Sequence, residues 1–155
     1  SEGKKLALVS DAGTPTISDP GVLLVDKVRK ELKDVQIVAL PGASALSTAL
    51  SASGISSASF TFYGFFPHKN DRETLFRTIA ESGMTSVFYE SVHRIEKTLE
   101  SLSLVLDKER RVVVARELTK MYEEVIRGSA EEILLYFKEN KDRVRGEFVV
   151  IIEGK

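Results

Sequence analysis

The feature that most constrains this chain is an alternation of short apolar runs with longer stretches of helical periodicity. Leu6–Ser10 (LALVS) is an apolar run that stops at a turn-forming cluster, and Val35–Leu40 (VQIVAL) is a second such run. Between them, Asp19 is placed to cap a helix that has Pro20 at its first position. Apolar residues spaced three and four apart predict the buried face of that helix: Val22, Val25, Val28 and Leu32. The pattern predicts a βαβ unit with parallel strands and a right-handed crossover.

A change of composition after a second helix predicts a boundary between two lobes. Small residues over 44–53 predict this helix, and Gly54 is placed to end it. A run of Gly, Ser and Ala follows over Gly54–Ser59. We therefore expect residues 1–54 to be the C-terminal part of an N-terminal, cofactor-binding lobe and residues 55–155 to be a C-terminal lobe.

The second lobe continues the alternation of strands and helices. Its helices are predicted at Arg72–Glu81, Arg94–Leu106 and Ala130–Lys138. Its strands are predicted at Phe60–Phe66, Thr85–Glu90, Arg111–Glu117, Glu123–Arg127 and Phe148–Glu153, the third and fourth forming a hairpin. The expected fold class is α/β, with a partial parallel N-terminal lobe and a mixed-sheet C-terminal lobe.

The first lobe has only two clear strands, which is few for a stable sheet. A two-stranded parallel sheet buries little surface and leaves both edges unpaired. We expect residues upstream of Ser1 to supply further strands, so that this chain is a piece of a longer protein. The alternative is that a second copy of the chain covers the open edge.

Composition excludes several classes of site. The 155 residues contain no cysteine, which excludes disulfides, thiolate metal ligands and cysteine nucleophiles and fits a cytoplasmic protein. Two histidines, His68 and His93, make a zinc site improbable. No apolar run approaches the ~20 residues that span a membrane. The net charge of −1 predicts that any contact with RNA is a local patch.

Two loops follow the expected strands of the first lobe and predict one binding site. The first is Ser10–Pro15 (SDAGTP), in which Gly13 allows close backbone approach, while Asp11 and Thr14 offer polar oxygens. The second, Leu40–Ala45 (LPGASA), opens a helix whose free N–H groups face the same crevice. The plainer interpretation is that the first loop is a simple turn and that Ser44 is only a helix cap.

Three further motifs carry charged residues beyond residue 60. Phe65–Arg72 (FFPHKNDR) combines aromatic rings with His68, Lys69 and Arg72, a mixture suited to stacking on bases and contacting phosphates. Tyr89–Arg94 (YESVHR) offers a carboxylate, an imidazole and a guanidinium. Arg116–Lys120 (RELTK) places two cations around a carboxylate. For each motif the plainer interpretation is a solvated set of charges at the end of a strand.

Read together, the motifs carry a resemblance to a known family. The blocks run along the whole chain in this order: LVSDAGTPTISDPG, ALPGASALSTALSASG, FYGFFPHK, FYESVHR, ARELTK and GEFVVIIEG. They resemble the successive signatures of the ribosomal RNA small subunit methyltransferase I family, within the tetrapyrrole-methylase superfamily. Val92 stands where that family usually has proline. The superfamily otherwise methylates porphyrin-like rings or acts in diphthine synthesis.

The resemblance implies a function and a set of site residues. It implies two α/β lobes that bind S-adenosylmethionine between them, a homodimer, and methylation of a cytidine 2′-hydroxyl in 16S rRNA of the small ribosomal subunit. By motif, the cofactor pocket is lined by Asp11, Gly13, Thr14, Ser44, Ala45 and Tyr89. A basic substrate rim is implied from Lys69, Arg72, His93, Arg94, Arg116 and Lys120.

For the mechanism, Glu90 is the candidate base that activates the ribose hydroxyl, and Lys120 is the candidate cation that stabilises the forming alkoxide. Two other functions stay open at this stage. One is a superfamily methyltransferase acting on a tetrapyrrole-like small molecule, which predicts a deep apolar cleft without a basic rim. The other is an inactive piece that only folds and dimerises.

Overall fold

The computed structural model describes residues 3–67 and 71–155, so His68 and Lys69 of the third motif lie outside the described residues. The chain divides into two compact units, Ser1–Ser44 and Ala45–Lys155, here called the N-terminal and C-terminal units. None of the described helices is long and apolar enough to cross a membrane.

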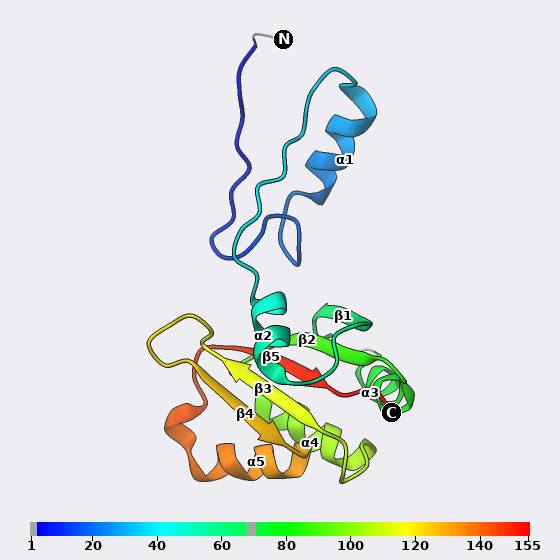
Figure 1. Ribbon diagram of the computed structural model, residues 1–155, viewed down its shortest axis with the longest axis vertical. Helices are drawn as coiled ribbons and strands as arrows, with labels where there is room; N and C mark the ends of the chain where they lie inside the picture. Colours follow the sequence, from blue (N-terminus) through cyan, green and yellow to red (C-terminus); the bar gives the residue numbers. More distant parts are fainter. Residues whose placement is uncertain (1–2, 68–70) are drawn as a thin grey trace. The chain divides into compact units, whose positions relative to one another are not determined.

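In the C-terminal unit a five-stranded sheet lies between two layers of helices (Figure 1). Its strands run in the order β1-β2-β5-β3-β4 and are β1 Phe60–Phe65, β2 Thr85–Ser91, β3 Val112–Arg116, β4 Glu124–Gly128 and β5 Glu147–Ile152. β1 and β2 are parallel, whereas β5 is antiparallel to both β2 and β3. Strands β1, β2 and β3 therefore point the same way, and their carboxyl ends lie at one edge of the sheet.

The helices of this unit cover both faces of the sheet. One face packs against α2, and the other packs against three helices, as Figure 1 shows. Their bounds are α2 Ala45–Ser53, α3 Arg72–Glu81, α4 Ile95–Val105 and α5 Ala130–Glu139, followed by a short 3-10 helix, Lys141–Arg143. Because helices cover both faces, the middle of each central strand is an unbroken apolar run instead of an alternating pattern, and the polar residues of β2 and β3 lie towards the strand ends. All five residues of β3 are buried.

Two local signals explain where the helices of this unit lie. In α4, Ile95, Leu99 and Leu102 recur at steps of four and three and are fully buried against the sheet. At the start of α5, Ser129 accepts a hydrogen bond from the Glu132 backbone, and the Glu132 carboxylate accepts one from the Ser129 backbone. This reciprocal pair satisfies two N–H groups that the first helical turn leaves unbonded. The expected α/β class, the mixed sheet and the β3–β4 hairpin are confirmed.

The N-terminal unit differs from the expected βαβ unit. Neither Leu6–Ser10 nor Val35–Leu40 pairs as a strand, because a ladder needs a neighbouring strand for its backbone N–H and C=O groups and none of the described residues provides one. The apolar side chains of these runs are exposed, Leu6 at 93% and Leu40 at 80%. The two predicted strands are therefore not formed in the structure.

Helix α1 (Val22–Glu31) of the N-terminal unit forms where expected, but its cap and its burial differ from the prediction. Gly21, and not Asp19, precedes it, with φ of 122°. The backbone angle favours glycine, and a Cβ at this position would also have to displace the end of the Leu8 side chain, which lies 2.7 Å away at Cδ2. No residue of α1 is buried; of the predicted buried face, Val22 and Leu32 are exposed and the two other valines are half-buried.

The compact units meet in the sequence ten residues before the expected lobe boundary at residue 54. Helix α2 groups with the C-terminal unit because Ala49 and Leu50 are buried in one cluster with Val113 and Ile151 of the sheet. The division into a cofactor-binding lobe and a second lobe at residue 54 stays a prediction about function.

Candidate functional site

In the N-terminal unit the two predicted binding loops meet. The Thr14 hydroxyl donates a hydrogen bond to the Ala43 carbonyl oxygen over 3.0 Å, across 29 residues of sequence. Gly13 has φ of 75°, and a Cβ at this position would lie 3.9 Å from the same carbonyl oxygen. The loop SDAGTP therefore contacts the part of LPGASA that belongs to the same unit, residues 40–44, and these two segments are here called the double loop.

The first loop of this pair and the residues that follow it, 13–18, include three residues with left-handed backbone angles. Besides Gly13, both Thr16 (φ 74°) and Ser18 (φ 57°) occupy the left-handed region, which side chains other than glycine rarely adopt. Such residues cost roughly 1–3 kcal/mol each and cluster where a ligand or switch requires a defined backbone. The side chain of Asp11 is exposed beside them. This geometry suits a binding loop better than a plain connection.

The second loop leads directly into α2. Ser44 is half-buried, and Ala45 is the first residue of the helix. The start of a helix carries partial positive charge, so this turn suits a carboxylate or another electron-rich group. Ser44 and Ala45 thus lie where the sequence placed them, at a helix start.

In the C-terminal unit the remaining motifs gather at the carboxyl edge of β1, β2 and β3 (Figure 1). The segment after β1 begins at Phe66, and the segment after β2 includes His93. In register, Glu90 of β2 and Arg116 of β3 lie on either side of Phe148 of β5. Ligands in open α/β sheets bind at the carboxyl ends of the strands. We call this end of the sheet the carboxyl edge.

Tyr89 contributes an aromatic cluster at this edge. Its ring makes edge-to-face contacts with Phe62 at 5.0 Å and Phe65 at 5.3 Å between centroids. Burial raises the pKa of the Tyr89 hydroxyl, and a hydrogen bond with the Leu46 backbone partly offsets that rise. The hydroxyl therefore stays protonated at neutral pH. Phe65 is 61% exposed, so one ring of the cluster is open to solvent.

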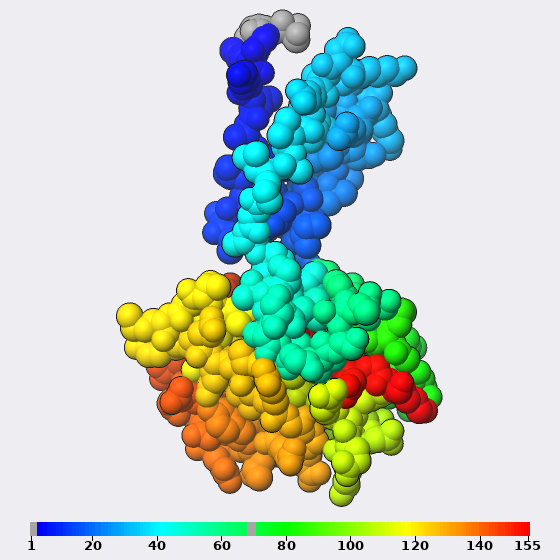
Figure 2. All heavy atoms as spheres, viewed as in Figure 1, coloured from blue at the N-terminus to red at the C-terminus, as the bar shows by residue number. Residues whose placement is uncertain are grey.

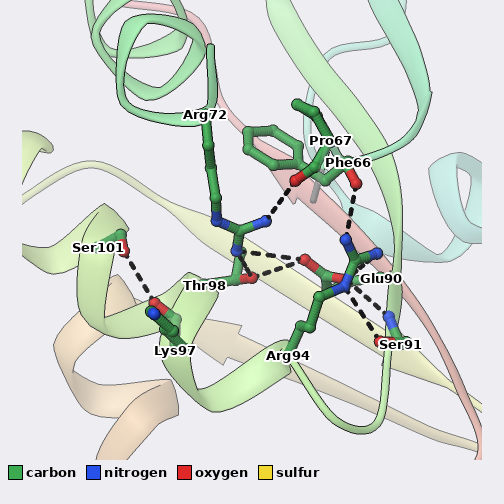
Figure 3. Close-up of polar contacts among 9 residues, drawn as sticks. All are labelled: Phe66, Pro67, Arg72, Glu90, Ser91, Arg94, Lys97, Thr98 and Ser101. Atoms are coloured by element: carbon green, nitrogen blue, oxygen red, sulfur yellow. Dashed lines mark hydrogen bonds and ion pairs between the residues drawn. The ribbon is translucent and has the colours of Figure 1, made fainter. Parts of the chain in front are cut away.

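Glu90 lies at the centre of a buried polar cluster (Figure 3). Its side chain is fully buried, and its carboxylate lies 2.8 Å from Arg94 Nη2 and 3.5 Å from Arg72 Nη2. The Thr98 hydroxyl donates to the same carboxylate over 2.6 Å. Burial lowers the pKa of Arg72, whereas the neighbouring Glu90 carboxylate raises it. Three of the predicted site residues are thus brought together, with Thr98 as a fourth member.

Arg116 forms a second ion pair beneath the carboxyl edge. Its Nε lies 2.7 Å from a Glu124 oxygen, and only 4% of its side chain is exposed. Tyr136 donates a short hydrogen bond to the other Glu124 oxygen. Burial alone would raise the pKa of Glu124, but the hydrogen bonds from Arg116 and Tyr136 outweigh it and hold the pKa below its usual range.

Lys120 lies in the loop between β3 and β4, which projects from the unit (yellow in Figure 2). Its Nζ lies 3.0 Å from a Glu117 oxygen and 2.9 Å from a Glu147 oxygen. Hydrogen bonds to Glu147 and then Glu117 raise the pKa of Lys120, so this side chain stays a cation. Glu117 and Thr119 have φ of 48° and 64°, a second strained segment at the same edge.

The structure does not form the expected exposed basic rim from the residues it describes. Arg72, Arg94 and Arg116 turn inward, because each guanidinium group pairs with a carboxylate. These partners, Glu90 and Glu124, were not predicted from the sequence. His93 and Lys120 are exposed. Whether these residues contact a substrate stays a prediction, and Lys69 lies outside the described residues.

Sequence reasoning missed two residues that organise the edge. Thr98 is fully buried on the apolar face of α4, between Ile95 and Leu102. A polar residue on the apolar face of a helix indicates a buried hydrogen-bond partner, so the sequence alone could have identified it. Glu124 has no such signal, because a glutamate at the start of a strand is normally solvated. In the described residues no group of three or more His, Cys, Asp or Glu side chains is arranged to hold a metal ion.

Comparison with known proteins gives this geometry a context. Residues 1–134 match the family model of the Tetrapyrrole (Corrin/Porphyrin) Methylases. Ribosomal RNA small subunit methyltransferase I of Haemophilus influenzae is 46% identical over 155 residues, covering 99% of this chain and 54% of that protein. The protein of the same name from Escherichia coli O157:H7 is 45% identical over 154 residues, covering 99% of this chain and 53% of that protein. The chain thus spans about half the length of the curated relatives it matches.

Solved structures agree at the level of the fold. The methyltransferase CobJ superimposes with a TM-score of 0.63 at 19% identity, over 92% of this chain and 62% of that one. Uroporphyrin-III-C-methyltransferase from Thermus thermophilus superimposes with a TM-score of 0.60 at 15% identity, over 91% of this chain and 60% of that one. At such identities the likeness concerns the fold alone. The match of residues 1–134 to the family model establishes that the chain belongs to the tetrapyrrole (corrin/porphyrin) methylase family.

Proposed function

We propose that this chain is part of an S-adenosylmethionine-dependent methyltransferase that methylates the 2′-hydroxyl of a cytidine in 16S rRNA of the small ribosomal subunit. The observation that carries the proposal is the hydrogen bond from Thr14 to Ala43, which joins the two predicted binding loops. The names of the relatives, ribosomal RNA small subunit methyltransferase I, support the substrate class.

The double loop fits an aminoacyl-nucleoside cofactor. Gly13 leaves its side of the loop without a side chain, so a flat ligand can approach the backbone. The exposed Asp11 carboxylate can accept hydrogen bonds from an amine or from ribose hydroxyls. Ser44 and Ala45 offer the start of α2 to a carboxylate. When bound, S-adenosylmethionine supplies an electrophilic methyl group.

Residues of the carboxyl edge are proposed to act on the RNA substrate, either by activating the ribose hydroxyl or by contacting the surrounding RNA. A ribose hydroxyl becomes more acidic beside a fixed positive charge, and Lys120 keeps its charge because two carboxylates raise its pKa. Exposed His93 and Phe65 are proposed to contact the RNA around the reacting ribose. We assign no proton transfer to Glu90, because its carboxylate is fully buried and already accepts hydrogen bonds on both oxygens.

A second candidate function is methylation of a tetrapyrrole-like small molecule. The observation that favours it is the inward orientation of Arg72, Arg94 and Arg116, which removes three cations from the surface that RNA would meet. Transfer of methyl groups to small ribosomal subunits, but not to a porphyrin-type ring, would support the first proposal over the second. An inactive piece would do neither.

The test of the cofactor site is Thr14→Val in the intact protein that carries this chain. Loss of one hydrogen bond, worth ~0.5–1.5 kcal/mol, should weaken binding of S-adenosylmethionine by roughly two- to tenfold. Thr14→Ser keeps the hydroxyl and should bind normally. Thr78→Val removes a comparable threonine hydroxyl from the exposed face of α3 and serves as the matched control. Calorimetry reports the affinity.

Binding of S-adenosylmethionine that is the same in Thr14→Val as in the unaltered protein would remove the double loop from the cofactor site. Failure of the unaltered protein to transfer labelled methyl groups to small ribosomal subunits would reject the proposed function itself. We further propose a homodimer acting in the cytoplasm, which sedimentation of the intact protein and its fractionation with ribosomal subunits would test.

A further inference from the structure

The carboxylate of Glu90 receives more hydrogen bonds than an ordinary ion pair needs. One oxygen accepts from the Ser91 backbone N–H over 2.8 Å and lies 2.8 Å from Arg94 Nη2. The other accepts from the Thr98 hydroxyl over 2.6 Å and lies 3.5 Å from Arg72 Nη2. Because no part of this side chain is exposed, the cluster works through its protein partners and not through direct contact with a substrate.

Both arginines also donate hydrogen bonds to the segment that follows β1, Phe66–Pro67. Arg94 donates from Nη1 to the Phe66 carbonyl oxygen over 2.9 Å, and Arg72 donates from Nη1 to the Pro67 carbonyl oxygen over 3.1 Å. Figure 3 shows the two guanidinium groups reaching these consecutive carbonyls from either side of Glu90. Arg72 opens α3 and Arg94 precedes α4, so two helices hold the chain where it leaves β1.

The ring of Phe66 is fixed as firmly as its carbonyl. It is fully buried, stacks on Phe76 at 4.7 Å and lies 4.5 Å from the ring of Phe88. The Arg72 guanidinium lies 5.0 Å from the centre of the Phe66 ring. The Phe66 N–H donates to the Tyr89 carbonyl oxygen over 3.3 Å. Its side chain and both backbone polar groups are therefore all held in place.

The charges make this arrangement depend on Glu90. Two guanidinium groups share one carboxylate, and burial together with the charge of Arg94 lowers the pKa of Arg72, which the Glu90 carboxylate counteracts. Without the carboxylate, the arginines repel each other and lose the partner that aims them at the two carbonyls. The carbonyl groups of Phe66 and Pro67 should then be held less firmly, because their donors are Arg94 and Arg72.

We propose that Glu90 is a positioning residue, which acts through Arg72 and Arg94 to fix the end of β1 and thereby the presentation of the RNA substrate. The expected effect of Glu90 on substrate binding rests on the proposed function, whereas its expected effect on the backbone at the end of β1 does not. As a positioning residue, Glu90 should change how tightly the ribosomal subunit binds and leave the pH dependence of the rate unaltered. Loss of a general base would instead change the pH dependence of the rate and leave binding of the subunit unaltered.

The first variant is Glu90→Gln in the intact protein, with Glu153→Gln as matched control. Glu153 also pairs with an arginine, Arg111, but this pair lies at the other end of the sheet and is partly exposed. We expect Glu90→Gln to lower kcat/KM for small ribosomal subunits by about 10- to 100-fold, mainly through a higher KM. The shape of the pH–rate profile should not change, and affinity for S-adenosylmethionine should stay within about twofold.

A second variant guards against loss of folding in the first. Thr98→Val removes the hydroxyl that links Glu90 to Arg72 while keeping the shape of the side chain, and Thr98→Ser restores the hydroxyl. Thr98→Val should raise KM in the same direction as Glu90→Gln, and Thr98→Ser should return it towards the unaltered value. Rescue by the conservative variant distinguishes the hydrogen bond from packing alone.

Hydrogen exchange supplies a readout that does not need activity. The Phe66 N–H should exchange about tenfold faster in both Glu90→Gln and Thr98→Val, and at the unaltered rate in Glu153→Gln. Unchanged exchange at Phe66 would overturn the proposal, as would loss of the acidic limb of the pH–rate profile with KM unchanged. Faster exchange in a protein that methylates no ribosomal subunit would uphold the positioning role and reject the proposed function.

Discussion

Gly146 gives the sharpest test of how the loop carrying Lys120 is held. This glycine precedes β5 with φ of 84°, and a Cβ built on it would overlap the Glu117 carboxylate and lie 2.5 Å from Glu117 Cγ. The same carboxylate accepts from the Glu147 N–H over 3.1 Å and from Lys120 Nζ over 3.0 Å. Gly146→Ala should therefore strain the backbone and displace Glu117 together.

The expected loss in the free energy of unfolding is the sum of three contributions: backbone strain, a lost hydrogen bond and a lost ion pair. A left-handed backbone angle costs alanine ~1–2 kcal/mol. Displacing Glu117 removes one backbone hydrogen bond, worth ~0.5–1.5 kcal/mol, and a partly exposed ion pair with Lys120, worth ~0–1 kcal/mol. The free energy of unfolding should fall by about 2–4 kcal/mol. For a domain of this size that lowers the melting temperature by roughly 6–15 °C.

Urea unfolding followed by circular dichroism measures the effect, and Gly83→Ala is the control. A Cβ at Gly83 has no atom within 4 Å, so this substitution should change the unfolding free energy by less than ~1 kcal/mol. In a Glu117→Ala background the overlap is gone, and Gly146→Ala should then cost only the ~1–2 kcal/mol of backbone strain. An equal cost in both backgrounds would refute the reasoning, since it would mean that Glu117 is not what excludes the side chain.

Two further predictions concern stability. Because hydrogen bonds hold the pKa of Glu124 below its usual range, its pairing with Arg116 stabilises the fold above about pH 4.3 and is lost as pH falls through the lowered pKa. Glu124→Gln should therefore flatten the loss of stability in acid, measured by urea unfolding between about pH 7 and pH 3. Ser129→Ala removes the side chain that caps α5 and should cost ~1 kcal/mol at neutral pH, which Ser129→Thr should largely restore.

The elements of the C-terminal unit could be predicted because their signals are local. Helix α3 occupies the predicted range, Arg72–Glu81, and the strands differ from prediction by a residue or two at their ends. The periodicity of a helix and the unbroken apolar run of a strand buried on both faces are both contained within about a dozen residues. Turn residues between the runs then mark where each element stops.

Pairings between distant segments could not be read in this way. The runs Leu6–Ser10 and Val35–Leu40 have the composition of strands, but a strand also needs a neighbour, and their own residues do not specify one. The same limit applied to the arginines. Arg72 and Glu90 are 18 positions apart on different elements, so the sequence presented them as separate exposed charges, whereas the fold makes them partners.

This pairing changes what the charged motifs mean. At the carboxyl edge, Arg72 and Arg94 lie inside with Glu90, whereas Lys120 and His93 face solvent. Glu90 can alter a reaction only through the groups it holds, because its side chain has no exposed surface, and little of either arginine side chain is exposed. The exposed side chains of Lys120 and His93 can reach a substrate. Substitutions of these charged residues should therefore have different kinetic effects. Those in the buried cluster should raise KM, because they alter the position of the backbone, whereas substitution of Lys120 should lower kcat, because it removes a charge.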